Sequence, residues 1–187
     1  MITLNSDAAS TSLSKTTKAI LNEYGIKLNK NLGQNYLIDR NKRDQIIQFG
    51  NLTKDDVVLE IGPGIGTLTI ELAKRVKKVI AIEQDSNICQ ILENRLKKEN
   101  IDNVDLINDD ALNVEFPKFD KIISNLPYQI SSPITFKFLN YDFQLAILMY
   151  QKEFASRMNG KVGSKDYSRL SAMLYFKCDV DLSLIHI

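Results

Sequence analysis

A four-residue motif, Asn125-Leu126-Pro127-Tyr128, has the residue types needed to hold an aromatic amine for alkylation. The exocyclic amine of adenine is a poor nucleophile because its lone pair is delocalised into the ring. We expect the Asn125 side-chain oxygen and the Leu126 carbonyl to accept hydrogen bonds from that amine, which aims its lone pair at an electrophilic methyl group. Pro127 fixes the backbone so that the carbonyl points outward, and Tyr128 offers a face for stacking the base. The alternative is a structural turn.

A glycine-rich segment, Gly62-Pro63-Gly64-Ile65-Gly66, follows an apolar run and predicts a small-molecule site. Glycines let the backbone pass close to a ligand at the carboxyl end of a strand in an open α/β sheet. The dinucleotide fingerprint needs a third glycine where Thr67 stands, so a pyrophosphate is less favoured than an adenosyl ligand without phosphates. Gly62 and Gly64 are the candidate contacts. The alternatives are a nicotinamide-dependent oxidoreductase and a structural turn.

Two acids are expected at the ends of the next two strands. Glu83 stands 21 residues after Gly62, where a carboxylate can accept hydrogen bonds from both hydroxyls of a ribose. Asp110 ends the following strand and can accept a hydrogen bond from the adenine amine of the cofactor. Asp109 is the competing candidate, and we prefer Asp110 because Ala111-Leu112 follows it. Each acid has an ordinary surface carboxylate as its alternative. With the glycine loop, these acids predict S-adenosylmethionine as the cofactor.

Short apolar runs alternate with helical patterns along most of the chain. We expect strands at 57–61, 78–83, 104–108, 121–124 and 145–150. Short apolar strands separated by helices are typical of a doubly wound, mostly parallel sheet. The predicted class is therefore α/β, with a Rossmann-like arrangement that places the glycine loop, the acids and the four-residue motif at the carboxyl ends of the strands.

Helical patterns fill the intervals between these strands. We expect helices at 14–24, 41–49, 67–76 and 168–176, and another that ends near Lys98. Asp39 is expected to cap the second of these, and Asp85 or Ser86 the one that ends near Lys98. Ser132, with Pro133 at the first helical position, opens a further helix.

The two ends of the chain differ from the middle. Residues 1–14 are rich in Ser, Thr, Ala and Asn, and we expect a disordered leader before a catalytic domain at 15–187. Residues 179–187 alternate like a strand, and a fold of this type normally closes its sheet with a strand pair. We therefore expect an incomplete sheet and a truncated chain. Basic ends flank an acidic middle, which suits either a polyanion gripped beside a cofactor pocket or ordinary solvated surface.

Composition narrows the class of protein further. The chain has 187 residues, of which 44% are hydrophobic and 25% charged, as expected for one globular domain. Cys89 and Cys178 are expected to be buried thiols in a reducing compartment. The single histidine, His186, argues against histidine general-base chemistry and a His-rich metal site. No apolar run reaches the roughly 20 residues that span a bilayer, and the first residues lack the basic-then-apolar pattern of a secretion signal. We expect a cytoplasmic protein without a metal or a membrane partner.

Taken together, these motifs resemble the KsgA family of ribosomal RNA small-subunit adenine dimethyltransferases. The resemblance covers about residues 29–180, and the segments that carry it are Leu32-Gly-Gln-Asn-Tyr-Leu37, Glu60-Ile-Gly-Pro-Gly64, Glu83, Asp110-Ala-Leu112, Asn125-Leu-Pro-Tyr-Gln-Ile-Ser-Ser-Pro133, Gln151-Lys-Glu153 and Tyr167-Ser-Arg-Leu-Ser171. It implies cofactor contacts from Asn35, Leu37, Gly62, Glu83, Asp110 and Asn125. It also implies a monomeric enzyme that makes four methyl transfers onto two adjacent adenosines near the 3′ end of small-subunit rRNA, within a pre-ribosomal particle.

Two alternatives stay close to this resemblance. The Erm macrolide-resistance methyltransferases dimethylate large-subunit rRNA, but Gly33-Gln34-Asn35 and Gly62-Pro63-Gly64 favour the small-subunit enzymes. A non-catalytic RNA-binding assembly factor is the other alternative, and the intact motifs disfavour it. Asp109 stands where many family members have glycine. Members of the family continue into a small C-terminal helical domain, which we expect to be absent because nothing after Val180 matches it.

Overall fold

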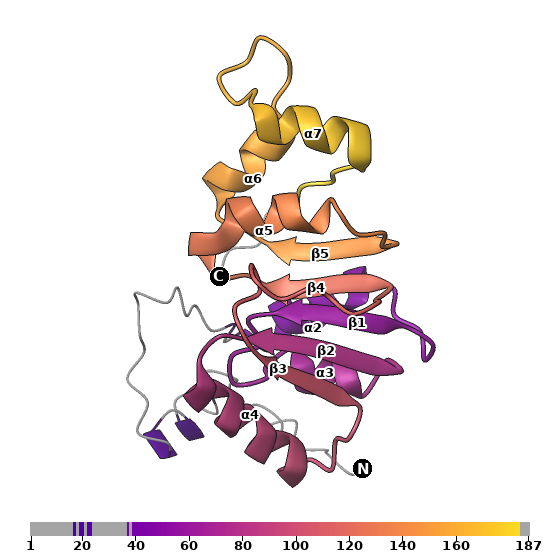
Figure 1. The fold of residues 1–187 in the computed structure, drawn as a ribbon, viewed down its shortest axis with the longest axis vertical. Helices are drawn as coiled ribbons and strands as arrows, with labels where there is room; N and C mark the ends of the chain where they lie inside the picture. The colour runs from indigo at the N-terminus through magenta and orange to yellow at the C-terminus, as the bar shows by residue number, and fades with distance from the viewer. Residues whose placement is uncertain (1–16, 18, 21, 24–36, 38, 184–187) are drawn as a thin grey trace, which may run out of the picture.

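The fold is built around a parallel sheet whose five strands lie in the order β3-β2-β1-β4-β5 (Figure 1). The structure is a computed structural model that describes residues 17, 19, 20, 22, 23, 37 and 39–183. The strands are β1 (Val57–Ile61), β2 (Lys78–Glu83), β3 (Val104–Asn108), β4 (Lys121–Asn125) and β5 (Leu145–Met149). All the strands expected between residues 57 and 150 are therefore confirmed, as is the Rossmann-like, doubly wound class.

Seven helical segments connect or follow these strands in residues 39–183. They are α2 (Arg40–Phe49), α3 (Thr69–Ala73), α4 (Ser86–Lys98), the 3-10 turn η3 (Tyr128–Ile130), α5 (Ser131–Phe138), α6 (Lys152–Met158) and α7 (Arg169–Lys177). The expected N-caps of α2 and α4 are confirmed. One carboxylate oxygen of Asp39 accepts the amide of Asn41 at 2.8 Å, and that of Asp85 accepts the amide of Asn87 at 2.9 Å. Each cap satisfies an amide that has no partner inside its helix.

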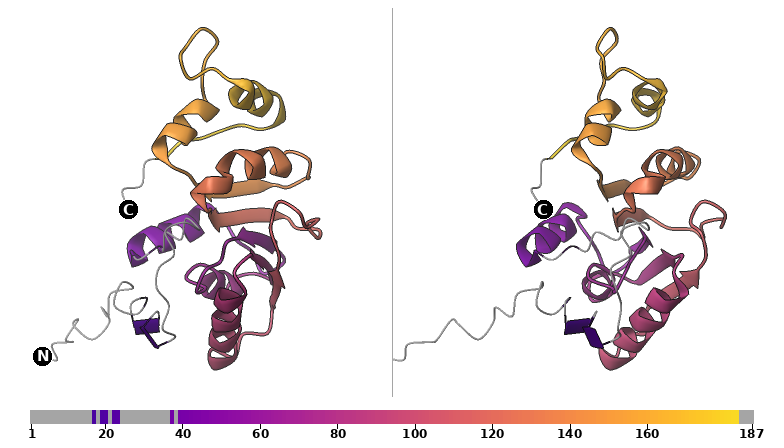
Figure 2. Two further views of the ribbon diagram at one scale, coloured as in Figure 1. Left: turned by 60° about the vertical axis from the view of Figure 1, so that its left-hand side comes forward. Right: turned by 90° about the vertical axis from the view of Figure 1, so that its left-hand side faces the viewer.

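Both faces of the sheet are covered, as the apolar strands require. Val58 and Ile123 share one apolar cluster with residues of α2 and α3, and α4 packs beside α3 on the same face. Leu59 and Ile122 point to the other face and pack with Phe138 of α5. Figure 2 shows α2 and α5 on opposite sides of the sheet. The chain runs from β1 outward through β2 to β3, then returns to β4 on the other side of β1. The carboxyl ends of β1 and β4 therefore flank the switch point at which such sheets bind ligands.

Helices α6 and α7 lie beyond β5 and form a small apolar cluster of their own (Figure 1). Met158, Leu170 and Leu174 form this cluster, and Phe136 of α5 and its C-cap residue Leu139 pack against it. The helix over 168–176 was expected from the sequence, whereas α6 was not. A helix of seven residues without a side-chain cap carries little local sequence signal, and its packing on α7 accounts for its formation.

Three expectations were wrong in detail. α5 begins at Ser131 with Ile130 as its N-cap, so Ser132 is not the cap and Pro133 stands third in the helix. The preceding η3 runs directly into α5, and a proline is tolerated there because first-turn amides have no intrahelical acceptor. The helix expected over 67–76 is regular only in α3. Residues 179–183 form no strand; instead, the Asn159 side chain donates to the Val180 carbonyl at 2.9 Å.

The remaining expectations about the ends are tested only in part. Thr17, Ala19, Ile20, Asn22 and Glu23 are helical, in agreement with the expected helix at 14–24. The leader at 1–14, the boundary at residue 15 and residues 184–187 lie outside the described residues.

No helix in the described part is long and apolar enough to cross a membrane. The same residues hold no cluster of His, Cys, Asp and Glu suited to a metal ion.

The two cysteines differ in their surroundings. Cys89 of α4 is buried as expected, and burial raises the pKa of its thiol to about 11. Cys178 is only half-buried, so the expectation that both thiols are buried was wrong for this one. It is the C-cap of α7 and packs against the apolar cluster that includes Met158 and Leu174. Both thiols are free.

Candidate active site

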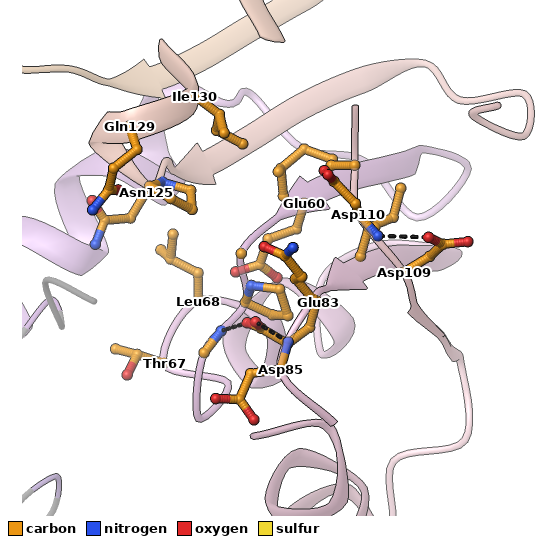
Figure 3. Close-up of a pocket in the computed structure, with 18 of the residues that line it drawn as sticks. Glu60, Thr67, Leu68, Glu83, Asp85, Asp109, Asp110, Asn125, Gln129 and Ile130 are labelled. Carbon is orange, nitrogen blue, oxygen red and sulfur yellow. Dashed lines mark hydrogen bonds between the residues drawn. The ribbon is translucent and has the colours of Figure 1, made fainter. Parts of the chain in front are cut away.

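A cavity of about 380 Å³ opens at the carboxyl ends of β1, β2, β3 and β4 (Figure 3). This volume is within the range of small-molecule sites. The sequence-predicted residues that line it are Leu37, Gly62, Gly64, Glu83, Asp110, Asn125 and Pro127. Asn35 lies outside the described residues. The topology thus brings together side chains from the ends of four strands that are far apart in the sequence.

The glycine loop lies directly against the Asn125–Tyr128 segment. Gly62 has φ +69° and Gly64 φ +56°, in the left-handed region that favours glycine. The Gly62 amide still donates to the Ile82 carbonyl at 2.9 Å, which keeps the start of the loop attached to β2. A Cβ atom on Gly62 would lie 3.0 Å from Cδ of Pro127. A side chain at this position would therefore be strained and would push on the segment that carries Asn125.

Glu83 is held in place at the end of β2. One of its carboxylate oxygens accepts the Gly64 amide at 3.2 Å, and the other accepts the Asp85 amide at 3.1 Å. Burial raises the pKa of Glu83, and the amides of Asp85 and Gly64 oppose the rise. Because each carboxylate oxygen can accept more than one hydrogen bond, Glu83 keeps acceptor capacity toward the cavity.

Asp109 and Asp110 both line the cavity after β3, but they point differently. Asp109 accepts the Asp110 amide at 2.7 Å, and Asp110 accepts the Leu112 amide at 2.9 Å. Figure 3 shows the Asp109 carboxyl pointing away from the other labelled acids. This orientation supports the preference for Asp110 as the group that meets the cofactor adenine.

The four residues of the Asn125–Tyr128 motif have different surroundings. Asn125 is the last residue of β4, and it lines the cavity together with Pro127. Leu126 turns its side chain into the core and is 2% exposed. Tyr128 begins η3 and is half-buried, but it is not among the residues that line this cavity. Its expected stacking role stays a prediction.

Several cavity residues were not predicted from the sequence. Gln129 of η3 lies beside Asn125 at the end of the cavity opposite Asp109 and Asp110 (Figure 3). Glu60 lies within the apolar strand β1, between Leu59 and Ile61, and is 1% exposed. The signal for Glu60 was present in the sequence, since an acid inside an apolar strand next to a glycine loop is rarely structural. The lining residues not predicted from the sequence are Glu60, Ile61, Pro63, Thr67, Leu68, Ile82, Gln84, Asp85, Ala111, Gln129 and Ile130.

Glu60 has the most perturbed carboxyl of the site. Burial raises its pKa to about 8, and the nearby charge of Glu83 adds to the rise, whereas the Thr69 hydroxyl opposes it. One Glu60 carboxyl oxygen is buried without a hydrogen-bond partner. Such a group takes up a proton or a nearby positive charge.

The cavity is strongly acidic. Five carboxyl side chains line it, and its lining contains no lysine or arginine among the described residues. A positively charged ligand is favoured in such an environment, and a pyrophosphate is disfavoured. The lining therefore supports the sequence-based preference for an adenosyl ligand over a nicotinamide dinucleotide.

Replacing Glu60 by glutamine is expected to change how stability depends on pH. At pH values between 4.5 and about 8, the Glu60 carboxyl has lost its proton in the unfolded chain but keeps it in the folded chain. The wild-type protein therefore loses stability through this group as pH rises across that window. Relative to wild type, the free energy of unfolding of Glu60→Gln should rise by up to about 1.4 kcal/mol per pH unit. Urea unfolding at several pH values measures this difference, and a constant difference would contradict the assignment.

The fold and cavity together define the class of protein. A doubly wound parallel sheet with an acidic cavity at its switch point is the architecture of Rossmann-like methyltransferases. The profile of the ribosomal RNA adenine dimethylase family matches residues 25–185. The chain belongs to this family.

Individual relatives agree with this membership. A probable ribosomal RNA small subunit methyltransferase A from Methanothermobacter thermautotrophicus is 55% identical over 166 residues, which are 89% of this chain and 60% of the relative. The crystal structure of a dimethyladenosine transferase from Plasmodium falciparum has a TM-score of 0.69 and 41% identity over 73% of this chain and 50% of that one. The 23S rRNA methyltransferase ErmE has a TM-score of 0.66 and 34% identity over 75% of this chain and 57% of that one. The chain spans about 60% of the length of the curated relatives it matches.

Proposed function

We propose that this chain binds S-adenosylmethionine in the acidic cavity and transfers its methyl groups to N6 of adenine in small-subunit rRNA. The observation that carries the proposal is the position of Asn125 and Pro127, which share one cavity with the glycine loop, Glu83 and Asp110. Membership of the ribosomal RNA adenine dimethylase family supports the same chemistry.

The cofactor contacts follow from the arrangement of the lining. Gly62 and Gly64 allow close approach of the ligand, Glu83 accepts hydrogen bonds from the ribose, and Asp110 accepts one from the adenine amine. Leu37 is 2% exposed and adds an apolar wall. The ionised carboxyl groups of the lining stabilise a ligand that carries a sulfonium and an ammonium charge. S-adenosylmethionine, when bound, supplies an electrophilic methyl group.

The Asn125–Tyr128 segment positions the amine that is methylated. Asn125 and the Leu126 carbonyl accept hydrogen bonds from the two amine protons, so the nitrogen lone pair points to the methyl group. Tyr128 stacks on the extruded base, and Pro127 holds the backbone against Gly62. No general base is required, because the methylated ammonium loses its proton to water.

The proposed substrate is two adjacent adenosines near the 3′ end of small-subunit rRNA, within a pre-ribosomal particle in the cytoplasm, with the enzyme acting as a monomer. Fold similarity alone does not separate the two ribosomal subunits, since ErmE, a 23S rRNA methyltransferase, has a TM-score of 0.66. The more similar relative, at 55% identity, carries a small-subunit name. The decisive assay presents purified small-subunit and large-subunit particles separately with S-adenosylmethionine. Mass spectrometry should find N6,N6-dimethyladenosine only in the small-subunit rRNA.

The rival functions give different results in simple assays. A nicotinamide-dependent oxidoreductase would bind NAD in preference to S-adenosylmethionine, and parallel calorimetric titrations separate the two. A non-catalytic assembly factor would bind small-subunit particles without methylating them. Either result would overturn the proposed activity.

Replacing Glu83 by alanine is expected to weaken S-adenosylmethionine binding by about 1–3 kcal/mol, because two ligand hydroxyls lose their charged acceptor. Wild-type affinity is expected in the micromolar range, and isothermal titration calorimetry measures both values. Glu93→Ala is the matched control, since Glu93 is an exposed glutamate on α4. An unchanged affinity in Glu83→Ala would rule out the ribose assignment.

A further inference from the structure

Lys137 on α5 reaches across the second face of the sheet to the loop that follows β3. Its ammonium donates to the carbonyl oxygens of Ala111 at 2.8 Å and Leu112 at 3.2 Å, and also to that of Val114. The ammonium also lies 4.3 Å from the centre of the Phe116 ring. A lysine ammonium has three N–H donors, so this loop occupies all of them.

The loop that Lys137 holds is the one that carries the acids of the cavity. Asp110 begins a tight turn in which its own carbonyl accepts the amides of Asn113 at 2.9 Å and Val114 at 3.1 Å. The carbonyls of this turn point toward Lys137, so the ammonium closes the turn from its other side. Asp109, Asp110 and Ala111 all line the cavity. The position of the Asp110 carboxylate therefore depends on the Lys137 contacts.

The helix that carries Lys137 is connected to the opposite wall of the same cavity. α5 follows directly after η3, whose residues Gln129 and Ile130 line the cavity next to Asn125. One side chain thus ties the loop after β3 to the helix that follows the Asn125–Tyr128 segment. The cation–π contact with Phe116 adds to this attachment, and Phe116 itself is buried in the core beside Phe138.

We propose that Lys137 is a positioning residue for cofactor binding, which sets the Asp110 carboxylate at the adenine end of the cavity through the turn over residues 110–114. This inference rests on the proposed function, since it assigns Lys137 to the S-adenosylmethionine site. Lys137 does not touch the ligand and takes no part in methyl transfer itself.

Lys137→Met tests the proposal because methionine keeps an unbranched apolar stem and removes all three donors. The dissociation constant for S-adenosylmethionine should rise by about tenfold or more, since a charged group with several hydrogen bonds is lost. In the full protein acting on small-subunit particles, KM for the cofactor should rise by a similar factor, and kcat should change by less than about threefold. Lys118→Met is the matched control, because Lys118 is an exposed lysine near the same loop.

A double-variant cycle separates positioning from general destabilisation. If Lys137 acts through Asp110, Lys137→Met should have little further effect on cofactor affinity in an Asp110→Ala background. Hydrogen exchange should also become faster at the Leu112 and Val114 amides, while the amides of β1 and β2 stay protected. Lys137→Arg keeps donors at this position and should recover part of the affinity. If Lys137→Met does not fold, Lys137→Gln takes its place in the same cycle.

The outcomes distinguish this inference from the proposed function. A wild-type protein that does not bind S-adenosylmethionine would overturn the proposed function and this inference with it. A wild-type protein that binds, combined with a folded Lys137→Met or Lys137→Gln variant of equal affinity, would overturn only the role of Lys137. Full additivity of the Lys137 and Asp110 effects would likewise exclude action through Asp110.

Discussion

Replacing Asn125 by alanine is expected to slow methyl transfer by at least about 100-fold, because a misplaced nucleophile loses most of the benefit of a prepositioned reaction. Asn125 ends β4 at the switch point of the sheet, and it lines the cavity opposite the acids after β3 (Figure 3). Its side-chain oxygen is the acceptor that we assign to the adenine amine. Without that acceptor, the amine is neither aimed nor polarised toward the methyl group.

The same change should leave cofactor affinity within a few-fold of wild type, since Glu83 and the glycine loop remain intact. Single-turnover methylation of small-subunit particles, followed by mass spectrometry, measures the rate, and calorimetry measures the affinity. Asn140→Ala is the matched control, because Asn140 is an exposed asparagine just after α5. Dimethylation by Asn125→Ala at the wild-type rate would exclude the catalytic role.

Asp56→Ala is expected to lower the free energy of unfolding by about 3–5 kcal/mol, the cost of leaving one charge of a buried pair unpaired. The Asp56 carboxylate lies 2.9 Å from the Lys121 ammonium, and both side chains are 8% exposed. The same carboxylate oxygen accepts the Thr53 amide at 2.6 Å, and Lys121 also donates to the Asn51 carbonyl at 2.7 Å. The pair therefore joins the starts of β1 and β4 at the amino ends of the strands, away from the cavity.

An exposed ion pair on the same sheet provides the comparison. Lys78 and Asp105 are 2.6 Å apart, but their side chains are 43% and 54% exposed, so Asp105→Ala should cost no more than about 1 kcal/mol. Chemical denaturation measures both variants. Adding Lys121→Met to the Asp56 variant should recover part of the loss, because it removes the unpaired charge. Equal losses of unfolding free energy in Asp56→Ala and Asp105→Ala would show that the buried pair contributes no more to stability than the exposed pair.

The acidity of Asp56 adds a pH dependence to this pair. Burial opposes ionisation, but the hydrogen bonds from Thr53 and Lys121 outweigh it and lower the pKa below 3.8. The stabilisation is therefore complete above pH 3.8 and is lost as pH falls through the lower pKa of the folded state. This dependence has the opposite sign to that of Glu60, whose buried carboxyl destabilises the fold as pH rises.

The sequence by itself determined the sheet and the main candidate ligand contacts of the cavity. Alternating apolar runs and capping acids are local signals, so the strands, the caps at Asp39 and Asp85 and the α/β class could be predicted within a residue or two. Parallel strands end at one edge of their sheet, and this rule was enough to bring Gly62, Glu83, Asp110 and Asn125 to a common cavity. The same local signals failed for the start of α5 and for α6, where neighbouring segments decide the structure.

Only the tertiary structure decided how these groups act on one another. The pKa of Glu60 rises because its strand is covered on both faces, and the chain of β1 alone does not specify that burial. Gly62 lies against Pro127, which is 65 residues away in the sequence. Lys137 donates to the carbonyls of Ala111 and Leu112, which precede it by about 25 residues. Such contacts depend on which elements pack side by side. Desolvation and hydrogen-bond geometry are properties of that packing, and no local pattern in the sequence encodes them.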